Sequence, residues 1–345
     1  MRTTEIRKTG VRVSELGFGG GGLGELFTKI TDRDADETLA EMWGGGVRYY
    51  DTAPLYGRGL SELRVGRHLR GQERDAFAVA TKIGRVLRAP ADPAGWAADP
   101  FWAGGLPFDY DFDYSYDAVM RSHADSLQRF GLNRIDVLVI HDLDTFTLDA
   151  ATLEEHWGAL ERSGWRALEE LRASGAVGAI GLGINPLGEI PRFLDAFDLD
   201  FAMVVGQYTL LDQAAYPVVL EDCRRRGVDV VLAATFNSGI LAQGPVAGAT
   251  FNYQPADGAA IDRVARLTAV CERHGVPLQA AAIQFPLAHP VVRTVLVGPI
   301  TAAQARENVR AYEHPIPGEL WDELRSEGWI AQDAPTPADA AASSH

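Results

Sequence analysis

The residues best suited to chemistry lie in the stretch 47–57, Val-Arg-Tyr-Tyr-Asp-Thr-Ala-Pro-Leu-Tyr-Gly. A short β-branched and aromatic run ends in Asp51, Pro54 favours a turn, and Tyr56 follows five residues after the carboxylate. The stretch therefore places an acid and a phenol together just past the end of a predicted strand. In parallel-sheet enzymes, the carboxyl ends of strands are where chemistry is placed. We interpret Tyr56 as the catalytic group.

Two further polar residues follow predicted strands in the same way. Lys82 comes directly after the apolar run 76–81, and His141 directly after the run 135–140. A tyrosine has an unperturbed pKa of about 10, and a nearby ammonium lowers this pKa by favouring the phenolate. Asp51 would hold Lys82 charged, and His141 would orient a substrate oxygen. The set favours exchange of a proton on oxygen, whereas acyl transfer and glycoside hydrolysis fit poorly.

Other uses of these residues stay open. Lys82 could form a Schiff base in a barrel lyase or aldolase. The chain could also be a non-catalytic subunit that only binds a cofactor. His141, Asp142 and Asp144 have a spacing that a metal could use, but that spacing is unspecific and we expect no metal site. Each of the four residues taken alone has an ordinary structural explanation; Asp51, for example, could cap a turn. The prediction of a catalytic site therefore rests on their occurring together.

The elements that must position these residues alternate along the chain. Each predicted strand is short and almost continuously apolar, as strands buried on both faces are, and each is followed by a predicted helix. Eight such units predict an α/β fold, a closed (β/α)8 TIM barrel over residues 1–330 whose strand ends meet at one mouth. An open doubly wound sheet is the alternative, weakened by the lack of a strand–GxGxxG–helix unit. The predicted strands are 16–18, 47–51, 76–81, 135–140, 177–184, 201–206, 228–234 and 292–297.

Three segments lie outside this alternation. Residues 4–14 alternate around Thr9-Gly10 and predict an N-terminal β-hairpin. The aromatic-rich insertion 84–114 predicts a lid or pocket wall, and with 142–162 it would form long loops at the C-terminal face. The stretch 331–345 is rich in Ala, Pro, Asp and Ser and predicts a disordered tail.

Composition narrows the class of protein. The formal net charge of −15 disfavours binding to nucleic acid or to an anionic membrane surface. The N-terminus is mixed charged and polar, no apolar run approaches membrane-spanning length, and two cysteines without CxxC spacing predict neither a disulfide framework nor a zinc site. We expect a cytoplasmic protein that acts on a small molecule, as a monomer or a homo-oligomer.

Four motifs resemble the aldo-keto reductases. They are Asp-Thr-Ala-x-x-Tyr-Gly at 51–57, Thr-Lys at 81–82, Ile-Asp-x-x-x-x-His at 135–141, and a glycine at 298 followed by Glu-Asn at 307–308. The resemblance covers essentially residues 5–312. It implies a TIM barrel, a nicotinamide cofactor and a catalytic tetrad of Asp51, Tyr56, Lys82 and His141. Tyr56 would be the proton donor in reduction and, as tyrosinate, the base in oxidation.

The same resemblance implies a set of cofactor-binding positions. Asn185 and Gln207 would hold the nicotinamide carboxamide, with Ile184 in place of the family's usual serine, and Phe236 would stack on the ring. Gly298 and Gln304 occupy places where NADP-preferring relatives carry basic residues, so we expect NAD, with NADP possible. The full set is Gly20, Asp51, Asn185, Gln207, Phe236, Ser238, Gly239, Leu241, Gly298, Gln304, Glu307 and Asn308.

Within that family, the chain is similar to a branch of sugar dehydrogenases. The similarity rests on the stretches 18–24, 50–62, 112–117, 122–127, 140–144 and 235–241. It implies oxidation of an aldose of the L-fucose, L-galactose or D-arabinose type at the anomeric carbon, giving a lactone and passing a hydride to NAD. A pyridoxal 4-dehydrogenase or a general aldehyde reductase is the alternative, because enzymes of the branch share these stretches.

Overall fold

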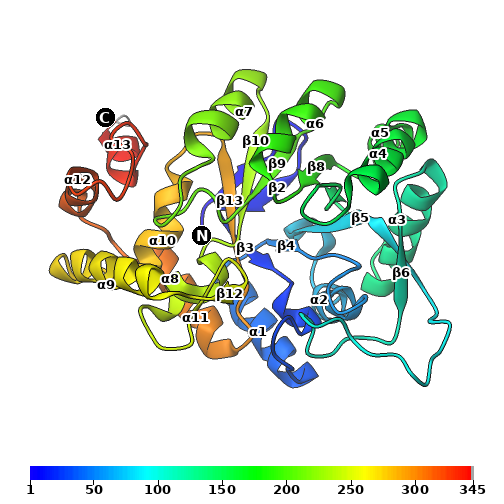
Figure 1. The fold of residues 1–345 in the computed structure, drawn as a ribbon, viewed down its shortest axis with the longest axis horizontal. Helices are drawn as coiled ribbons and strands as arrows, with labels where there is room; N and C mark the ends of the chain where they lie inside the picture. Colours follow the sequence, from blue (N-terminus) through cyan, green and yellow to red (C-terminus); the bar gives the residue numbers. More distant parts are fainter. Residues whose placement is uncertain (343–345) are drawn as a thin grey trace.

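Parallel strands form a closed barrel at the centre of the molecule (Figure 1). The computed structural model describes residues 1–342. Over these residues the strand order is β4-β3-β13-β10-β9-β8-β7-β5, and pairing of β4 with β5 closes the ring. The predicted eight-stranded (β/α)8 barrel is confirmed. Its strands are β3 (Leu16–Gly19), β4 (Tyr49–Asp51), β5 (Ala78–Arg88), β7 (Val137–His141), β8 (Ala179–Gly183), β9 (Phe201–Val205), β10 (Asp229–Ala233) and β13 (Val292–Val297).

Helices surround the barrel and bury their apolar faces against it. Helix α1 begins after Thr31, whose side chain forms a capping box with Asp34. Helix α4 lies within the predicted loop 142–162, where Asp149 caps its first turn. The helices are α1 (Asp32–Gly44), α2 (Leu60–Leu69), α3 (Tyr116–Phe130), α4 (Ala150–Ala159), α5 (Trp165–Ala173), α6 (Ile190–Ala196), α7 (Glu221–Arg226), α8 (Ile240–Gln243), α9 (Gly258–Arg273), α10 (Leu278–Leu287) and α11 (Ala302–Glu313).

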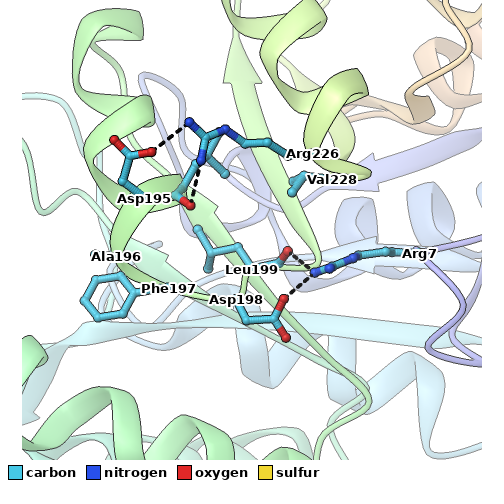
Figure 2. Close-up of a pocket in the computed structure, with 9 residues that line it drawn as sticks. Arg7, Asp195, Ala196, Phe197, Asp198, Leu199, Arg226 and Val228 are labelled. Carbon is cyan, nitrogen blue, oxygen red and sulfur yellow. Dashed lines mark hydrogen bonds and ion pairs between the residues drawn. The ribbon is translucent and has the colours of Figure 1, made fainter.

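The predicted N-terminal hairpin is present and closes the amino end of the barrel. Its strands β1 (Thr3–Glu5) and β2 (Arg12–Ser14) pair antiparallel. Ile6 and Val13 belong to the apolar cluster inside the barrel that also contains Phe201. At the turn, Arg7 Nη1 lies 2.7 Å from both Asp198 Oδ1 and the Leu199 carbonyl oxygen, and Figure 2 shows these contacts. The hairpin is thereby tied to the segment before β9.

The insertion 84–114 is built on an extension of β5. Strand β5 continues to Arg88, beyond the predicted end at residue 81, and pairs antiparallel with β6 (Asp109–Asp113). The connection between them returns over the mouth, where Trp102 bridges to Leu26 and the Phe27 N–H donates to the Phe101 carbonyl at 2.9 Å. The insertion therefore forms one wall beside the strand ends.

The C-terminal segment differs from the predicted disordered tail over residues 331–342. Helices α12 (Gly318–Ser326) and α13 (Pro337–Ala342) lie at one edge of the molecule (Figure 1). Ala334 and Thr336 are fully buried, and the Thr336 N–H donates to the Asp339 carboxylate at 2.8 Å. Composition alone misses such local capping. The remaining tail residues, 343–345, lie outside the described residues. Within 1–342, no helix is long and apolar enough to cross a membrane.

The contact between α2 and α3 generates a stability prediction. A Cβ on Gly66 would lie 2.1 Å from the Phe130 carbonyl oxygen, whereas a Cβ on Gly44 of α1 would meet no atom within 4 Å. Gly66→Ala should lower the free energy of unfolding by about 1–3 kcal/mol through overpacking. Gly44→Ala should leave it unchanged or raise it by about 0.5–1 kcal/mol, because alanine favours helix. Urea unfolding measures both, and equal effects would contradict the close packing.

Candidate active site

A buried ion pair joins the carboxyl ends of β4 and β5. Asp51 lies opposite Ala80 in the parallel register, and Lys82 follows two positions later, on the same face of the strand. Lys82 Nζ donates to Asp51 Oδ1 at 2.5 Å and to the Thr52 carbonyl at 2.9 Å. Both charged side chains are almost fully buried. Burial raises the pKa of Asp51, and the Lys82 charge opposes that rise.

The loop that carries Tyr56 is held from behind by the glycine-rich stretch 19–24. The Tyr56 N–H donates to the Ala53 carbonyl at 3.0 Å, which closes the predicted turn around Pro54. A Cβ on Gly24 would lie 2.4 Å from the Tyr56 carbonyl carbon. The Gly20 N–H donates to the Asp51 carbonyl at 2.7 Å. The glycines thus allow the close backbone approach that places the tyrosine.

The structure brings the four predicted catalytic residues together. Lys82 Nζ lies 5.1 Å from the centroid of the Tyr56 ring, and the His141 ring lies 5.9 Å from it at 82°. His141 ends β7, as predicted, and is buried. The Trp102 ring lies 5.8 Å from the Tyr56 ring on another side. The phenol therefore lies between an ammonium, an imidazole and an aromatic wall.

The electrostatics at Tyr56 differ from the sequence expectation. Burial raises the pKa of Tyr56 well above its usual value, and the carboxylates of Asp51 and Asp142 raise it further. Arg85 is the cation that opposes this rise. Lys82 was expected to lower this pKa, but its charge is paired with Asp51. Burial is therefore the largest effect on the Tyr56 pKa, and of the ion pair it is the Asp51 carboxylate that shifts it.

His141 is held neutral by its surroundings. Burial lowers the pKa of His141 well below its usual value, and the cations Arg85 and Lys82 lower it further. The Tyr114 hydroxyl donates to the His141 carbonyl at 2.5 Å, which anchors the end of β7. The next residue, Asp142, has φ 51°, a backbone conformation that non-glycine residues adopt at some energetic cost. A neutral imidazole in this position can donate one hydrogen bond into the mouth of the barrel.

Asn185 and Gln207, predicted to hold a carboxamide, lie next to each other past β8 and β9. Gln207 Nε2 donates to the Asn185 carbonyl at 2.8 Å, and the Asn185 N–H donates to Asp144 Oδ2 at 2.9 Å. Within residues 1–342 the side-chain amide of Asn185 makes no hydrogen bond, in contrast to its backbone N–H and carbonyl. Free amide donors and acceptors match the groups of a nicotinamide carboxamide. Ile184 is buried and offers only apolar contact. Asn185 and Gln207 are therefore the two residues whose side chains fit the nicotinamide carboxamide.

Of the predicted positions after β10, Phe236, Ser238 and Gly239 are partly exposed, whereas Leu241 is buried. Ser238 Oγ accepts from the Tyr253 N–H at 2.9 Å and thereby holds the hairpin of β11 (Thr250–Phe251) and β12 (Gln254–Pro255). Gly239 has φ 107°, and Phe236 is half-buried against the core. Leu241 is fully buried in the core, so its side chain is not available to a ligand.

The predicted positions after β13 lie just before α11 and within its first two turns. Gly298 is exposed. The Thr301 side chain caps α11, and Gln304 Oε1 in the first turn accepts from the Ile300 N–H at 2.9 Å. Glu307 is exposed and Asn308 is buried. Arg306 is paired with Glu41 at 2.6 Å. Neither of the side chains at 304 and 306 is a free cation that could bind a 2′-phosphate.

The barrel order separates these groups into two adjoining arcs. The catalytic candidates lie on or just after β4, β5 and β7, whereas the cofactor candidates after β8, β9, β10 and β13 occupy neighbouring strands. Among the described residues, no group of three or more His, Cys, Asp and Glu side chains could hold a metal ion.

Sequence reasoning missed the roles of four residues at this mouth. Arg85, Asp142 and Tyr253 act on the pKa of Tyr56, and Trp102 contacts its ring. The aromatic content of the insertion had pointed to a wall but not to Trp102 itself. Arg85 follows Gly84, whose φ of 114° interrupts the strand alternation. The direction of the Arg85 side chain could therefore not be predicted by alternation from that of Lys82.

The fold and the site together define an NAD(P)-dependent oxidoreductase on a (β/α)8 barrel. The model of the Aldo/keto reductase family matches residues 15–327, and the chain belongs to that family. It is 43% identical over 334 residues to a pyridoxal 4-dehydrogenase of Microbacterium luteolum, covering 94% of this chain and 97% of that protein. It is 40% identical over 318 residues to a D-threo-aldose 1-dehydrogenase of Pseudomonas sp, covering 91% and 94%. A holo-form aldo-keto reductase from Bacillus halodurans superposes with a TM-score of 0.71 at 26% identity, covering 94% and 96%.

The buried pair generates a prediction about stability. Lys82→Met should lower the free energy of unfolding by about 3–5 kcal/mol, because it leaves the Asp51 carboxylate buried without its partner. The loss should shrink as pH falls, since burial has raised the pKa of Asp51 and protonation removes the unpaired charge. The double variant Lys82→Met/Asp51→Leu should recover much of the stability. Urea unfolding at neutral and mildly acidic pH measures this; a loss that is independent of pH would exclude the stranded carboxylate as its cause.

Proposed function

We propose that the chain oxidises an aldose, in its ring form, at the anomeric carbon. The products are a lactone and reduced NAD. The observation that carries the proposal is the group formed by the buried Asp51–Lys82 pair, Tyr56 and His141 at one mouth. The 40% identity to a D-threo-aldose 1-dehydrogenase supports the choice of substrate.

In this proposal each residue has a defined role. Tyr56, as tyrosinate, accepts the proton of the anomeric hydroxyl, while His141 donates a hydrogen bond to the same oxygen and fixes its direction. The Asp51–Lys82 pair joins the ends of β4 and β5 next to the phenol. A bound nicotinamide ring would accept the hydride from the anomeric carbon. Asn185 and Gln207 would hold its carboxamide, and Trp102 would exclude water from one side.

Pyridoxal is the second candidate substrate, because the relative with 43% identity is a pyridoxal 4-dehydrogenase. The two substrates share one kind of chemistry. An aldopyranose carries a hemiacetal hydroxyl on its anomeric carbon, and pyridoxal can close to a hemiacetal through its neighbouring hydroxymethyl group. In both cases one base removes the hydroxyl proton while hydride leaves the same carbon, and the product is a lactone.

The deciding experiment measures NADH or NADPH formation from L-fucose, L-galactose, D-arabinose and pyridoxal, each with NAD and NADP. Turnover of a sugar with NAD at higher kcat/KM than pyridoxal is the expected result. Turnover of pyridoxal alone would select the second candidate. Cofactor binding without turnover of any compound in the panel would favour a non-catalytic subunit.

The Schiff-base alternative is not supported by the surroundings of Lys82. A nucleophilic lysine needs a neutral amine with access to the substrate. Lys82 Nζ instead donates to a carboxylate and a carbonyl, and the side chain is 1% exposed. Borohydride should therefore fail to trap a substrate on Lys82.

NAD is the proposed cofactor, and Gln304 provides the test. Gln304→Arg should raise the kcat/KM ratio of NADP to NAD about tenfold, because a guanidinium can pair with the 2′-phosphate. Gln304→Ala is the control, since both variants lose the bond from the Ile300 N–H and only one gains a cation. The measurement is steady-state kinetics with both cofactors. A wild-type chain that works efficiently only with NADP would overturn the NAD assignment.

Tyr56→Phe should abolish turnover and leave NADH affinity largely unchanged, because it removes only the phenolic hydroxyl. In the wild-type chain the oxidation rate should rise with pH as Tyr56 ionises. Since the pKa of Tyr56 is raised, the rise should continue into the alkaline range. NADH fluorescence titration and kcat/KM against pH measure the two effects. Near-normal turnover of the variant, or a flat pH profile, would remove Tyr56 from the role of base.

A further inference from the structure

Arg85 is a buried cation beside the catalytic candidates to which the proposed mechanism assigns no role. It lies on β5, three residues after Lys82, and is 5% exposed. Its Nη1 lies 2.9 Å from Asp142 Oδ2. Its guanidinium carbon lies 4.7 Å from the Phe112 ring centroid and 5.4 Å from that of Tyr110, both on β6. The ion pair and the two rings hold the guanidinium in one place.

The same guanidinium faces the imidazole of His141. Arg85 Nη1 lies 3.4 Å from His141 Nδ1, at the long end of hydrogen-bond distances. A guanidinium can only donate hydrogen bonds, so Nδ1 must be the acceptor and carry no proton. In a neutral imidazole the proton then lies on Nε2. Nε2 lies 3.5 Å from Asp142 Oδ2, so the proton faces an acceptor.

We propose that Arg85 is a positioning residue which, together with Asp142, holds neutral His141 in the tautomer whose Nε2–H can donate to the substrate oxygen. The catalytic use of that N–H rests on the proposed function. The tautomer itself does not, since it is a property of the protein without substrate. Asp142 Oδ2 is too far for a strong hydrogen bond, so a substrate oxygen can compete for the proton.

The charges around His141 favour a neutral imidazole. Two cations and one carboxylate lie near the ring, so imidazolium is disfavoured while the carboxylate keeps an acceptor next to Nε2. This agrees with the lowered pKa of His141. Removing the Arg85 charge would leave Asp142 unpaired and favour a second proton on the ring. The charged and titratable groups that face His141 are Arg85 of β5, Asp142, the Tyr56 ring and the Tyr114 hydroxyl on its carbonyl, and Lys82 of β5 acts on it through its charge.

Arg85 also acts on the phenol. Its charge lowers the pKa of Tyr56, whereas the Asp142 carboxylate raises it. Loss of Arg85 therefore removes the contact that keeps Nδ1 of His141 unprotonated, and it moves ionisation of the base to higher pH. Both effects reduce kcat near neutral pH, and neither requires a change in cofactor binding.

The first test is the tautomer of His141 in the substrate-free protein. Nitrogen-15 NMR distinguishes protonated from unprotonated ring nitrogens, and comparison with His141→Gln assigns the signals. The expected wild-type result is an unprotonated Nδ1 and a protonated Nε2. In Arg85→Met, part of the population should gain a proton on Nδ1. Wild-type His141 protonated on Nδ1, or a wild-type tautomer that persists in the variant, would overturn the proposal whether or not the substrate assignment holds.

The second test is kinetic and uses a matched control on the same strand. Arg88 is exposed and pairs with Asp109 and Asp111, away from the tetrad. Arg85→Met should lower kcat about 10²-fold and shift the pH profile to higher pH, while Arg88→Met should do neither. Guanidinium ion added to Arg85→Met, or Arg85→Lys, should restore part of the rate. An unchanged pH profile together with a purely KM effect would assign Arg85 a structural or substrate-contact role and overturn the proposal.

Discussion

The Asp51–Lys82 pair is the constraint on which the rest of the site depends. Removing two charges from water costs several kcal/mol for each ion, and the pair offsets this cost only with close contact and additional hydrogen bonds. Here the strand register supplies the contact, and the Thr52 carbonyl accepts a further hydrogen bond. The pair therefore fixes the separation of β4 and β5 at the mouth. The Tyr56 loop leaves β4 at that point, so its position follows from the pair.

Pairing also explains why the phenol is not made acidic by its nearest ammonium. Burial is the largest effect on the pKa of Tyr56, the Asp51 carboxylate raises this pKa further, and the Lys82 ammonium is taken up by its contact with that carboxylate. A site of this kind keeps the phenol protonated in the resting protein. Such a phenol is a competent acid for carbonyl reduction, whereas oxidation needs higher pH or further positive charge in the mouth. The Arg85–Asp142 pair adds a second nearly neutral unit beside it, and this unit acts on the orientation of His141 more than on net charge.

Much of the fold was predictable because its signals are local and repeated. The apolar runs that end in Asp51, Lys82 and His141 predicted strands, and the closed barrel then required the three side chains to converge. The family motifs also indicated Asn185 and Gln207, which lie side by side. The whole tetrad was thus predicted as a set, although its charge balance was not. Electrostatic balance depends on which oxygen meets which nitrogen, and spacing along the chain does not contain that information.

The predictions that differ from the structure involve residues whose position depends on distant contacts. The segment 331–342 looked unstructured by composition, but buried Ala334 and the capping of α13 give it a defined path. Arg85 shows the same dependence most clearly, because a single glycine with φ of 114° resets the strand alternation behind it. One glycine in the strand thus places Arg85, a permanent cation, in the site. The geometry of the imidazole, and not only the identity of the tetrad, then depends on a residue outside the family motifs.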